Sequence, residues 1–161
     1  MGIDGLRKNG FDGFLPIADL TDRHRQIPDK MSVYLVVTPD GFAPQYVERG
    51  AGGFFKGRDP NVSAAILSAA WVKDARVVNI GKAGGAASSS TLRKRLRQYT
   101  RFGQGQAVGH WGGRYSWQLQ GCHSLLICWK TTEAEPRNVE RELIAAFRGK
   151  FGVRRFANLQ D

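Results

Sequence analysis

The sequence has few cysteines and no long apolar stretch, and each of these absences excludes a class of protein. Two cysteines, Cys122 and Cys128, are too few among 161 residues for a disulfide-rich scaffold. No apolar run approaches the roughly 20 residues that a membrane-spanning helix needs. Residues 1–8 also lack the apolar stretch of a secretory signal. We therefore expect a cytoplasmic protein with no segment inserted in a membrane.

Acidic residues are also scarce. The chain has 14 Asp and Glu against 24 Lys and Arg, which gives a net charge of +10 at pH 7. Such an excess of positive charge attracts polyanions. Arginine supplies most of it, and the planar guanidinium group suits phosphate. We expect nucleic acid as the first candidate partner and an anionic membrane surface as the second. A basic protein with no polyanionic partner is the remaining alternative.

Length and hydrophobic pattern predict a single α+β domain over residues 1–161. A chain of this size can bury one hydrophobic core, and no internal repeat or linker divides it. Within the domain we expect an N-terminal arm over 1–30 and an inserted, helix-containing segment over 39–75. Strands are predicted over 33–38 and 75–80 and as a hairpin over 115–120 and 124–129; helices are predicted over 61–73, 91–101 and 136–148.

The helix predicted over 136–148 carries a glutamate on its apolar face. At about 100° per residue, Glu140 falls in the stripe formed by Val139, Leu143 and Phe147. A buried carboxylate must be paired, hydrogen-bonded or bound to a metal, because an unpaired buried charge is costly. A metal ligand or an acid/base group would explain Glu140. A structural salt bridge to an arginine is the alternative, and for this residue alone it is the commoner case.

The helix predicted over 91–101 turns one arginine toward the protein. Arg95 lies one turn before Tyr99, beside the apolar face that Leu92 and Leu96 form with it. Arg95 could hold a phosphate through two hydrogen bonds, or it could pair with Glu140. The other basic side chains point outward, where they either contact backbone phosphates or form a solvated face: Arg93, Lys94, Arg97 and Arg101.

Three further segments carry candidate groups. Gly81 and Lys82 follow a predicted strand, where exposed N–H groups and a lysine can receive a phosphate, although the surrounding residues exclude a Walker-type loop. Tyr34 lies in the first predicted strand, where a core tyrosine is the commoner case. Residues 110–117 offer His110 and Arg114 as nucleic-acid contacts, with a structural turn whose tryptophans enter the core as the favoured alternative.

Taken in order, these segments resemble the GIY-YIG nuclease family. Ser32-Val33-Tyr34 is similar to the first motif, and Asn79-Ile80-Gly81 followed by Lys82 is similar to the second. The later elements follow in the family's order: Arg95 with Tyr99, Glu140 in its helix, and Phe156-Ala157-Asn158. The resemblance covers residues 31–38 and 76–160 and is interrupted by 39–75.

The resemblance implies an endonuclease that hydrolyses DNA phosphodiester bonds on a three-stranded antiparallel sheet flanked by helices. It implies that Glu140 ligates one divalent cation, Mg²⁺ or Mn²⁺, both suited to oxygen ligands. Tyr34 would be the general base or would orient the attacking water. Arg95 and Lys82 would stabilise the phosphate, while Tyr99 and Asn158 would complete the pocket by hydrogen bonding.

Two departures from the family pattern bear on activity. Ser32 replaces the glycine of the first motif, and Asn79 replaces the tyrosine of the second, so Tyr34 acts alone or activity falls. A non-catalytic nucleic-acid-binding domain on the same fold is one alternative, and an enzyme acting on a smaller phosphoester is another. The expected substrate is double-stranded DNA. Because one active site cuts one strand, double-strand cleavage would imply either a homodimer or two successive binding events by a monomer.

Overall fold

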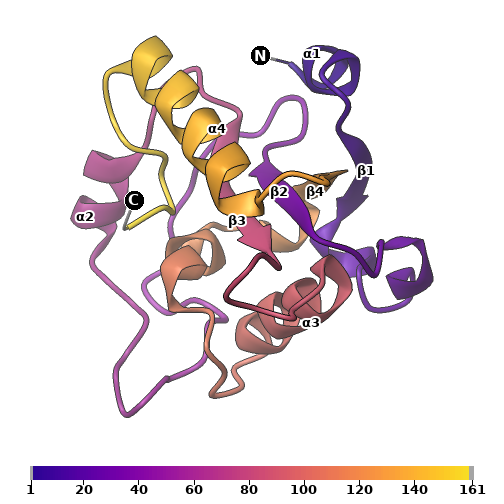
Figure 1. Cartoon of the computed structure of the whole chain (residues 1–161). Helices are drawn as coiled ribbons and strands as arrows, with labels where there is room; N and C mark the ends of the chain where they lie inside the picture. The colour runs from indigo at the N-terminus through magenta and orange to yellow at the C-terminus, as the bar shows by residue number, and fades with distance from the viewer. Residues whose placement is uncertain (1, 160–161) are drawn as a thin grey trace.

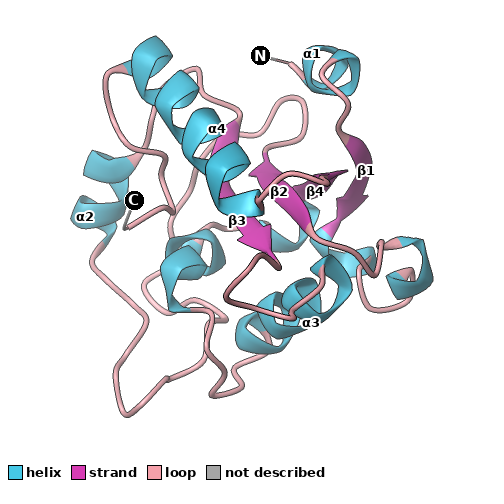
Figure 2. Cartoon of the chain, in the orientation of Figure 1, coloured by secondary structure: helices cyan, strands magenta, loops and turns pink. Residues whose placement is uncertain are grey.

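The computed structural model of the chain describes residues 2–159 and has an α+β fold (Figures 1 and 2). Residues 1, 160 and 161, which the predicted domain over 1–161 includes, lie outside the described residues. An antiparallel sheet of four strands has the order β1-β4-β2-β3. The strands are β1 Asp12–Pro16, β2 Ser32–Val37, β3 Val77–Ala83 and β4 Leu126–Thr131. The implied sheet of three strands is therefore extended by a fourth.

The extra strand, β1, lies in the predicted N-terminal arm over 1–30, for which no strand is predicted. It pairs with β4, but the register shifts between Gly13 and Leu15. Gly13 has a φ of 89° and Phe14 a φ of 55°, so the strand contains a bulge. A bulge in a strand of 5 residues destroys the two-residue alternation by which strands are predicted.

The predicted hairpin is wrong in its first arm. Residues Trp111–Gln118 form a 3₁₀ helix, η3, and only the second arm is a strand, β4. Tyr115, Ser116, Trp117 and Gln118 are all buried, whereas a half-exposed strand would bury alternate residues. Trp117 enters the core, as the structural-turn alternative for residues 110–117 expected.

The helices confirm three of the predicted segments with adjusted ends. They are α1 Ile3–Lys8, α2 Ala64–Ala70, α3 Leu92–Gly103 and α4 Pro136–Phe151, with short 3₁₀ helices η1 Ile17–Asp19, η2 His24–Gln26 and η4 Cys122–Ser124. Thr91 caps α3 by accepting a hydrogen bond from the Lys94 N–H at 3.5 Å. α4 ends at Gly152, whose φ of 70° stops the helix. Across residues 2–159, no helix has both the length and the apolar character to cross a bilayer.

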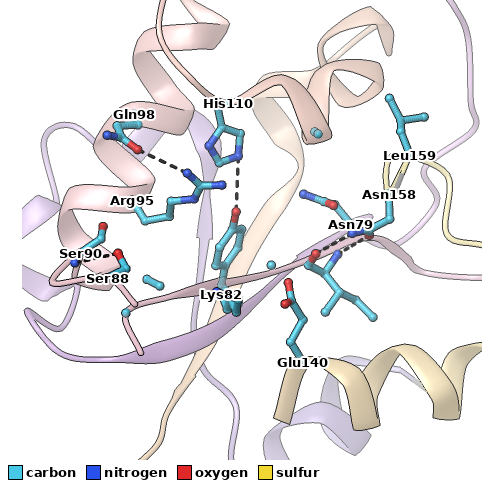
Figure 3. A pocket seen from close by; sticks show the side chains of 17 residues that line it. Asn79, Lys82, Ser88, Ser90, Arg95, Gln98, His110, Glu140, Asn158 and Leu159 are labelled. Carbon is cyan, nitrogen blue, oxygen red and sulfur yellow. Dashed lines mark hydrogen bonds between the residues drawn. The ribbon is translucent and has the colours of Figure 1, made fainter. Parts of the chain in front are cut away.

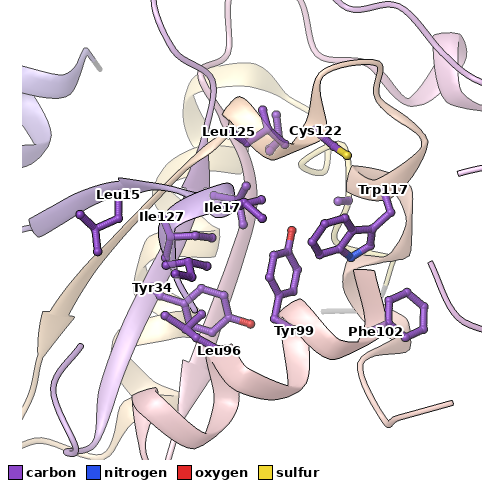
Figure 4. Close-up of a cluster of buried hydrophobic side chains, with 14 of the residues drawn as sticks. Leu15, Ile17, Tyr34, Leu96, Tyr99, Phe102, Trp117, Cys122, Leu125 and Ile127 are labelled. Carbon is purple, nitrogen blue, oxygen red and sulfur yellow. The ribbon is translucent and has the colours of Figure 1, made fainter. Parts of the chain in front are cut away.

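The central strand β2 is covered on both faces. Val33, Leu35 and Val37 point to one side, in a cluster that includes residues of α4. Tyr34 and Val36 point to the other side, in the cluster that α3 and η3 complete (Figure 4). Alternating side chains of one strand therefore serve two cores. Because β3 is an edge strand, side chains from both faces of the sheet can meet beyond it.

The inserted segment 39–75 is tied to η3 by backbone hydrogen bonds from Val47 and Ala51 and by the buried side-chain amide of Gln118. Gln118 donates to the carbonyl groups of Val47, Glu48 and Val62, and its Oε1 accepts from the Val62 N–H at 2.9 Å. These bonds hold the irregular part of the segment, which precedes α2, to the core. No residue of 39–75 lines the pocket described next.

Candidate functional site

A pocket of about 450 Å³ opens at the β3 edge of the sheet, where segments far apart in the sequence meet (Figure 3). Its wall brings together six of the seven predicted catalytic residues. Four of them carry titratable groups, Tyr34 from β2, Lys82 from β3, Arg95 from α3 and Glu140 from α4, and the other two are Asn79 and Asn158. Tyr34 and Glu140 approach from opposite faces of the sheet. The pocket thus collects a phenol, two cationic groups and a carboxylate.

Gly81 makes this crossing of the sheet edge sterically feasible. It lies directly opposite Tyr34 in the β2–β3 pairing, so the two positions share a face. A Cβ atom at position 81 would overlap the Cζ and Oη atoms of Tyr34. Only glycine therefore lets the tyrosine ring lie across β3 with its hydroxyl in the pocket. This is a physical reason for the glycine of the Asn79-Ile80-Gly81 motif.

The Tyr34 hydroxyl is held by a histidine. Tyr34 is 1% exposed, and its hydroxyl shares a long hydrogen bond of 3.4 Å with Nε2 of His110. Burial raises the pKa of Tyr34, and the nearby charge of Arg95 opposes that rise. The phenol is consequently protonated at neutral pH.

His110 belongs to the pocket and does not form an exposed contact surface. It is 3% exposed and packs edge-on against Tyr99, with ring centres 4.7 Å apart. Burial, aided by the charge of Arg95, lowers the pKa of His110 to about 3. The nucleic-acid contact predicted for His110 stays a prediction, since its imidazole is buried in the pocket wall. A neutral imidazole at this place can accept the Tyr34 hydroxyl proton in a hydrogen bond.

Arg95 and Glu140 face the same pocket without pairing. Nη1 of Arg95 donates to Oε1 of Gln98 at 3.4 Å, while its buried Nε has no acceptor among the described residues. Within 2–159 no ion pair joins Glu140 to an arginine. The structural salt bridge that offered an alternative explanation for both residues is thus not formed.

Burial raises the pKa of Glu140, even though Lys82, Arg155 and Arg95 each oppose the rise. The neighbouring positive charges therefore compensate the carboxylate only in part, in a site that is partly shielded from solvent. Such a group is a good ligand for a cation, because binding removes the cost of its desolvated charge.

The donor set fits a hard divalent cation. Glu140 is the only carboxylate in the pocket wall, and residues 2–159 contain no cluster of three or more His, Cys, Asp and Glu side chains. Mg²⁺ is commonly held by one or two carboxylates together with waters and substrate phosphate oxygens. Glu140 would hold Mg²⁺ or Mn²⁺ in that way, with the rest of the coordination left to water and phosphate.

Asn158 lies in the pocket wall, but its amide is engaged by the backbone. Its Oδ1 accepts from the Ile80 N–H at 2.7 Å, and its Nδ2 donates to the Ile80 carbonyl at 2.7 Å. Nε of Arg155 also donates to Asn158 Oδ1, at 3.1 Å. Asn158 thus continues the hydrogen bonding of the sheet beyond β3. Asn79, buried at 4% exposure, lines the same wall.

Tyr99 is not brought into the pocket. It is fully buried in the cluster between α3 and η3, where its ring centre lies 4.8 Å from that of Trp117 (Figure 4). Its position behind His110 supports the imidazole and leaves no contact with a substrate in the pocket. The implied role of Tyr99 in pocket hydrogen bonding therefore has no basis in the structure.

The outward arginines of α3 also lie away from the pocket. Nε of Arg93 donates to the Ile27 carbonyl at 3.0 Å, which ties α3 to the N-terminal segment. Nε of Arg101 donates to Oε1 of Gln106 at 2.7 Å. Arg97 is exposed and lines a separate hollow beside η2. As nucleic-acid contacts these residues remain predictions, since none of them borders the pocket.

Arg114 is partly buried in η3. Its guanidinium carbon lies 4.5 Å from the ring centre of Trp111 and 5.2 Å from that of Tyr115. Burial lowers the pKa of Arg114. Its stacking between aromatic rings stabilises η3, so a nucleic-acid role for Arg114 would need those contacts to open.

Some residues in or beside the pocket were not among the predicted site residues. Gln98 could have been found, because it lies three residues after Arg95 on the same helix. Arg155 is 2% exposed, and its charge acts on Glu140, but nothing in its sequence neighbourhood indicates an inward direction. Ser88 and Ser90 also line the pocket from the loop between β3 and α3.

Comparison of the chain with protein-family models, with curated proteins and with solved structures finds no match.

Proposed function

We propose that the chain is a metal-dependent endonuclease of the GIY-YIG type that hydrolyses DNA phosphodiester bonds. The observation that carries this proposal is that Arg95 and Glu140 face one pocket and leave each other unpaired. A guanidinium group binds the oxygens of a phosphate, and a carboxylate binds a divalent cation. A phosphodiester with its cation satisfies both groups at once.

Arg95 and Lys82 bind the non-bridging oxygens of the scissile phosphate. Their positive charges stabilise the additional negative charge that develops as water attacks phosphorus. A pocket that is partly shielded from solvent strengthens this effect, because the local dielectric is lower than in water. A cation held by Glu140 would supply Lewis-acid stabilisation of the same phosphate.

Tyr34 orients the attacking water. With His110 protonated on Nδ1, its Nε2 accepts the Tyr34 hydroxyl proton, and the lone pairs of the phenol oxygen can then accept a hydrogen bond from that water. His110 stays neutral and fixes the direction of the phenol. The oxygen of the water forms a bond to phosphorus and the bond from phosphorus to the 3′ oxygen breaks. The water releases one proton to solvent, and the 3′ oxygen takes one up from solvent. The products are a 5′-phosphate and a 3′-hydroxyl.

Asn79 favours a second candidate, a nucleic-acid-binding domain without cleavage. Its amide stands in the pocket wall where the resemblance expects a second phenol. Loss of that phenol removes one group able to act on the water. The pocket would then bind a phosphate without hydrolysing it.

Nicking of supercoiled plasmid DNA separates the two candidates. The wild type should nick the plasmid with Mg²⁺ and not with EDTA, whereas Glu140→Gln should bind DNA without nicking it. Glu142→Gln is the matched control, because Glu142 is exposed on the same helix and does not line the pocket. Wild-type binding with no nicking in either Mg²⁺ or Mn²⁺ would favour the non-catalytic candidate.

A further inference from the structure

A second hollow, of about 680 Å³, adjoins the pocket on the side of α4. The two hollows share Lys82, Glu140 and Asn158 in their walls. They are therefore parts of one groove that passes the β3 edge. A small phosphoester needs only the first part, but a polymer with one phosphate in the pocket would continue into the second.

Three arginines of α4 line the second hollow: Arg137, Arg141 and Arg148. On a helix these positions fall within about 40° of one another, on the flank next to Glu140. Arg137 and Arg141 are one turn apart, a rise of about 6 Å. Both are exposed, and neither has a hydrogen-bond or ion-pair partner in the described part of the chain. Arg137 and Arg141 thus provide two available guanidinium groups beyond the pocket.

The charge of this second hollow is strongly one-sided. Lys82 and the three arginines lie in its wall with a single carboxylate, Glu140, and no exposed large apolar side chain. A surface that binds anionic membrane would combine basic residues with exposed apolar ones. A recessed basic groove suits the backbone of a nucleic acid better.

We infer that the Arg137–Arg141 flank of α4 binds the phosphates next to the scissile one, on one side of the cleaved bond. The inference rests on the proposed function for the location of the scissile phosphate. It assigns sequence-independent affinity to α4, whereas the sequence indicated the outward face of α3. Arg93 and Arg101 of that face are already engaged by protein groups.

The test is the salt dependence of binding to a short DNA duplex, measured without divalent cations so that no cleavage occurs. Arg137→Gln with Arg141→Gln should weaken binding about tenfold at low salt and make the slope of log Kobs against log salt shallower by about 1.8, since each phosphate contact contributes about 0.9. The charge-matched control is Lys150→Gln with Arg25→Gln. Both residues are exposed and line neither hollow of the groove.

Equal slopes for the two double variants would overturn the inference. Loss of binding to phosphatidylserine vesicles with unchanged binding to DNA would also overturn it, in favour of a membrane surface. Plasmid nicking by the wild type decides the proposed function separately. A chain that never nicks but shows the predicted change in slope would keep the binding groove and lose the nuclease.

Discussion

The buried, neutral imidazole of His110 should make the fold sensitive to acid. Burial lowers its pKa from 6.5 to about 3. Because the pKa of His110 is lower in the folded state than in the unfolded state, its contribution to folding stability is complete above pH 6.5. That stabilisation is lost as the pH falls toward 3, since the unfolded chain binds the proton more readily.

The expected size of this effect follows from the shift. One pKa unit corresponds to about 1.4 kcal/mol, so the complete loss is about 5 kcal/mol. Between pH 7.5 and pH 4.5 the loss from His110 is about 3 kcal/mol. For a chain of this length that free energy corresponds to a fall of about 6–12 °C in Tm.

Urea unfolding at pH 7.5 and at pH 4.5 measures the effect in the wild type, in His110→Gln and in His24→Gln. Glutamine can still hydrogen-bond to the Tyr34 hydroxyl and does not titrate, so the acid-induced loss should shrink by about 3 kcal/mol in His110→Gln. Comparing each variant with itself at two pH values cancels the cost of repacking. His24 is exposed, and its variant should behave as the wild type does. The same acid-induced loss in all three proteins would refute a buried neutral His110.

Four other predictions follow from the pocket. Since burial raises the pKa of Glu140, its contribution to stability falls as the pH rises from 4.5 to the raised pKa and stays low above it. Thermal scans without Mg²⁺ should therefore show Glu140→Gln with the higher Tm at pH 7.5 and no advantage at pH 4. Gly81→Ala should cost about 1–3 kcal/mol in urea unfolding, because its Cβ overlaps the Tyr34 ring, and normal stability would contradict that packing. Asn158→Ala should cost about 1–3 kcal/mol in the same assay, because it leaves the N–H and C=O of Ile80 unpaired; an unchanged value would show that water replaces the amide. Tyr34→Phe should keep the fold and slow single-turnover DNA cleavage about 100-fold, and full activity would remove Tyr34 from the reaction.

Local patterns were sufficient to predict the elements that position the site. Strand β2 has a continuous β-branched and apolar run, and α3 and α4 have clear apolar stripes. The helical period also indicated that Arg95 and Glu140 turn inward. The direction of each side chain depends only on the spacing of residues within one helix, so it can be predicted from the local sequence.

Features that depend on packing between distant segments could not be predicted in this way. The bulged strand β1 is stabilised by pairing with β4, which lies more than a hundred residues later in the chain. Tyr99 and His110 show the same limit. Helical spacing placed Tyr99 beside Arg95, but the packing of η3 buries Tyr99 in the core and sets His110 against Tyr34. The bonds of Asn158 to Ile80 likewise join residues 78 positions apart.

Single-turnover cleavage of a labelled DNA duplex with Mg²⁺ tests most directly whether residues from three separate elements form one active site. Tyr34→Phe, Arg95→Gln and Glu140→Gln should each slow cleavage by about 100-fold or more, with circular dichroism showing a retained fold. Cleavage by any of the three at the wild-type rate would contradict a shared site.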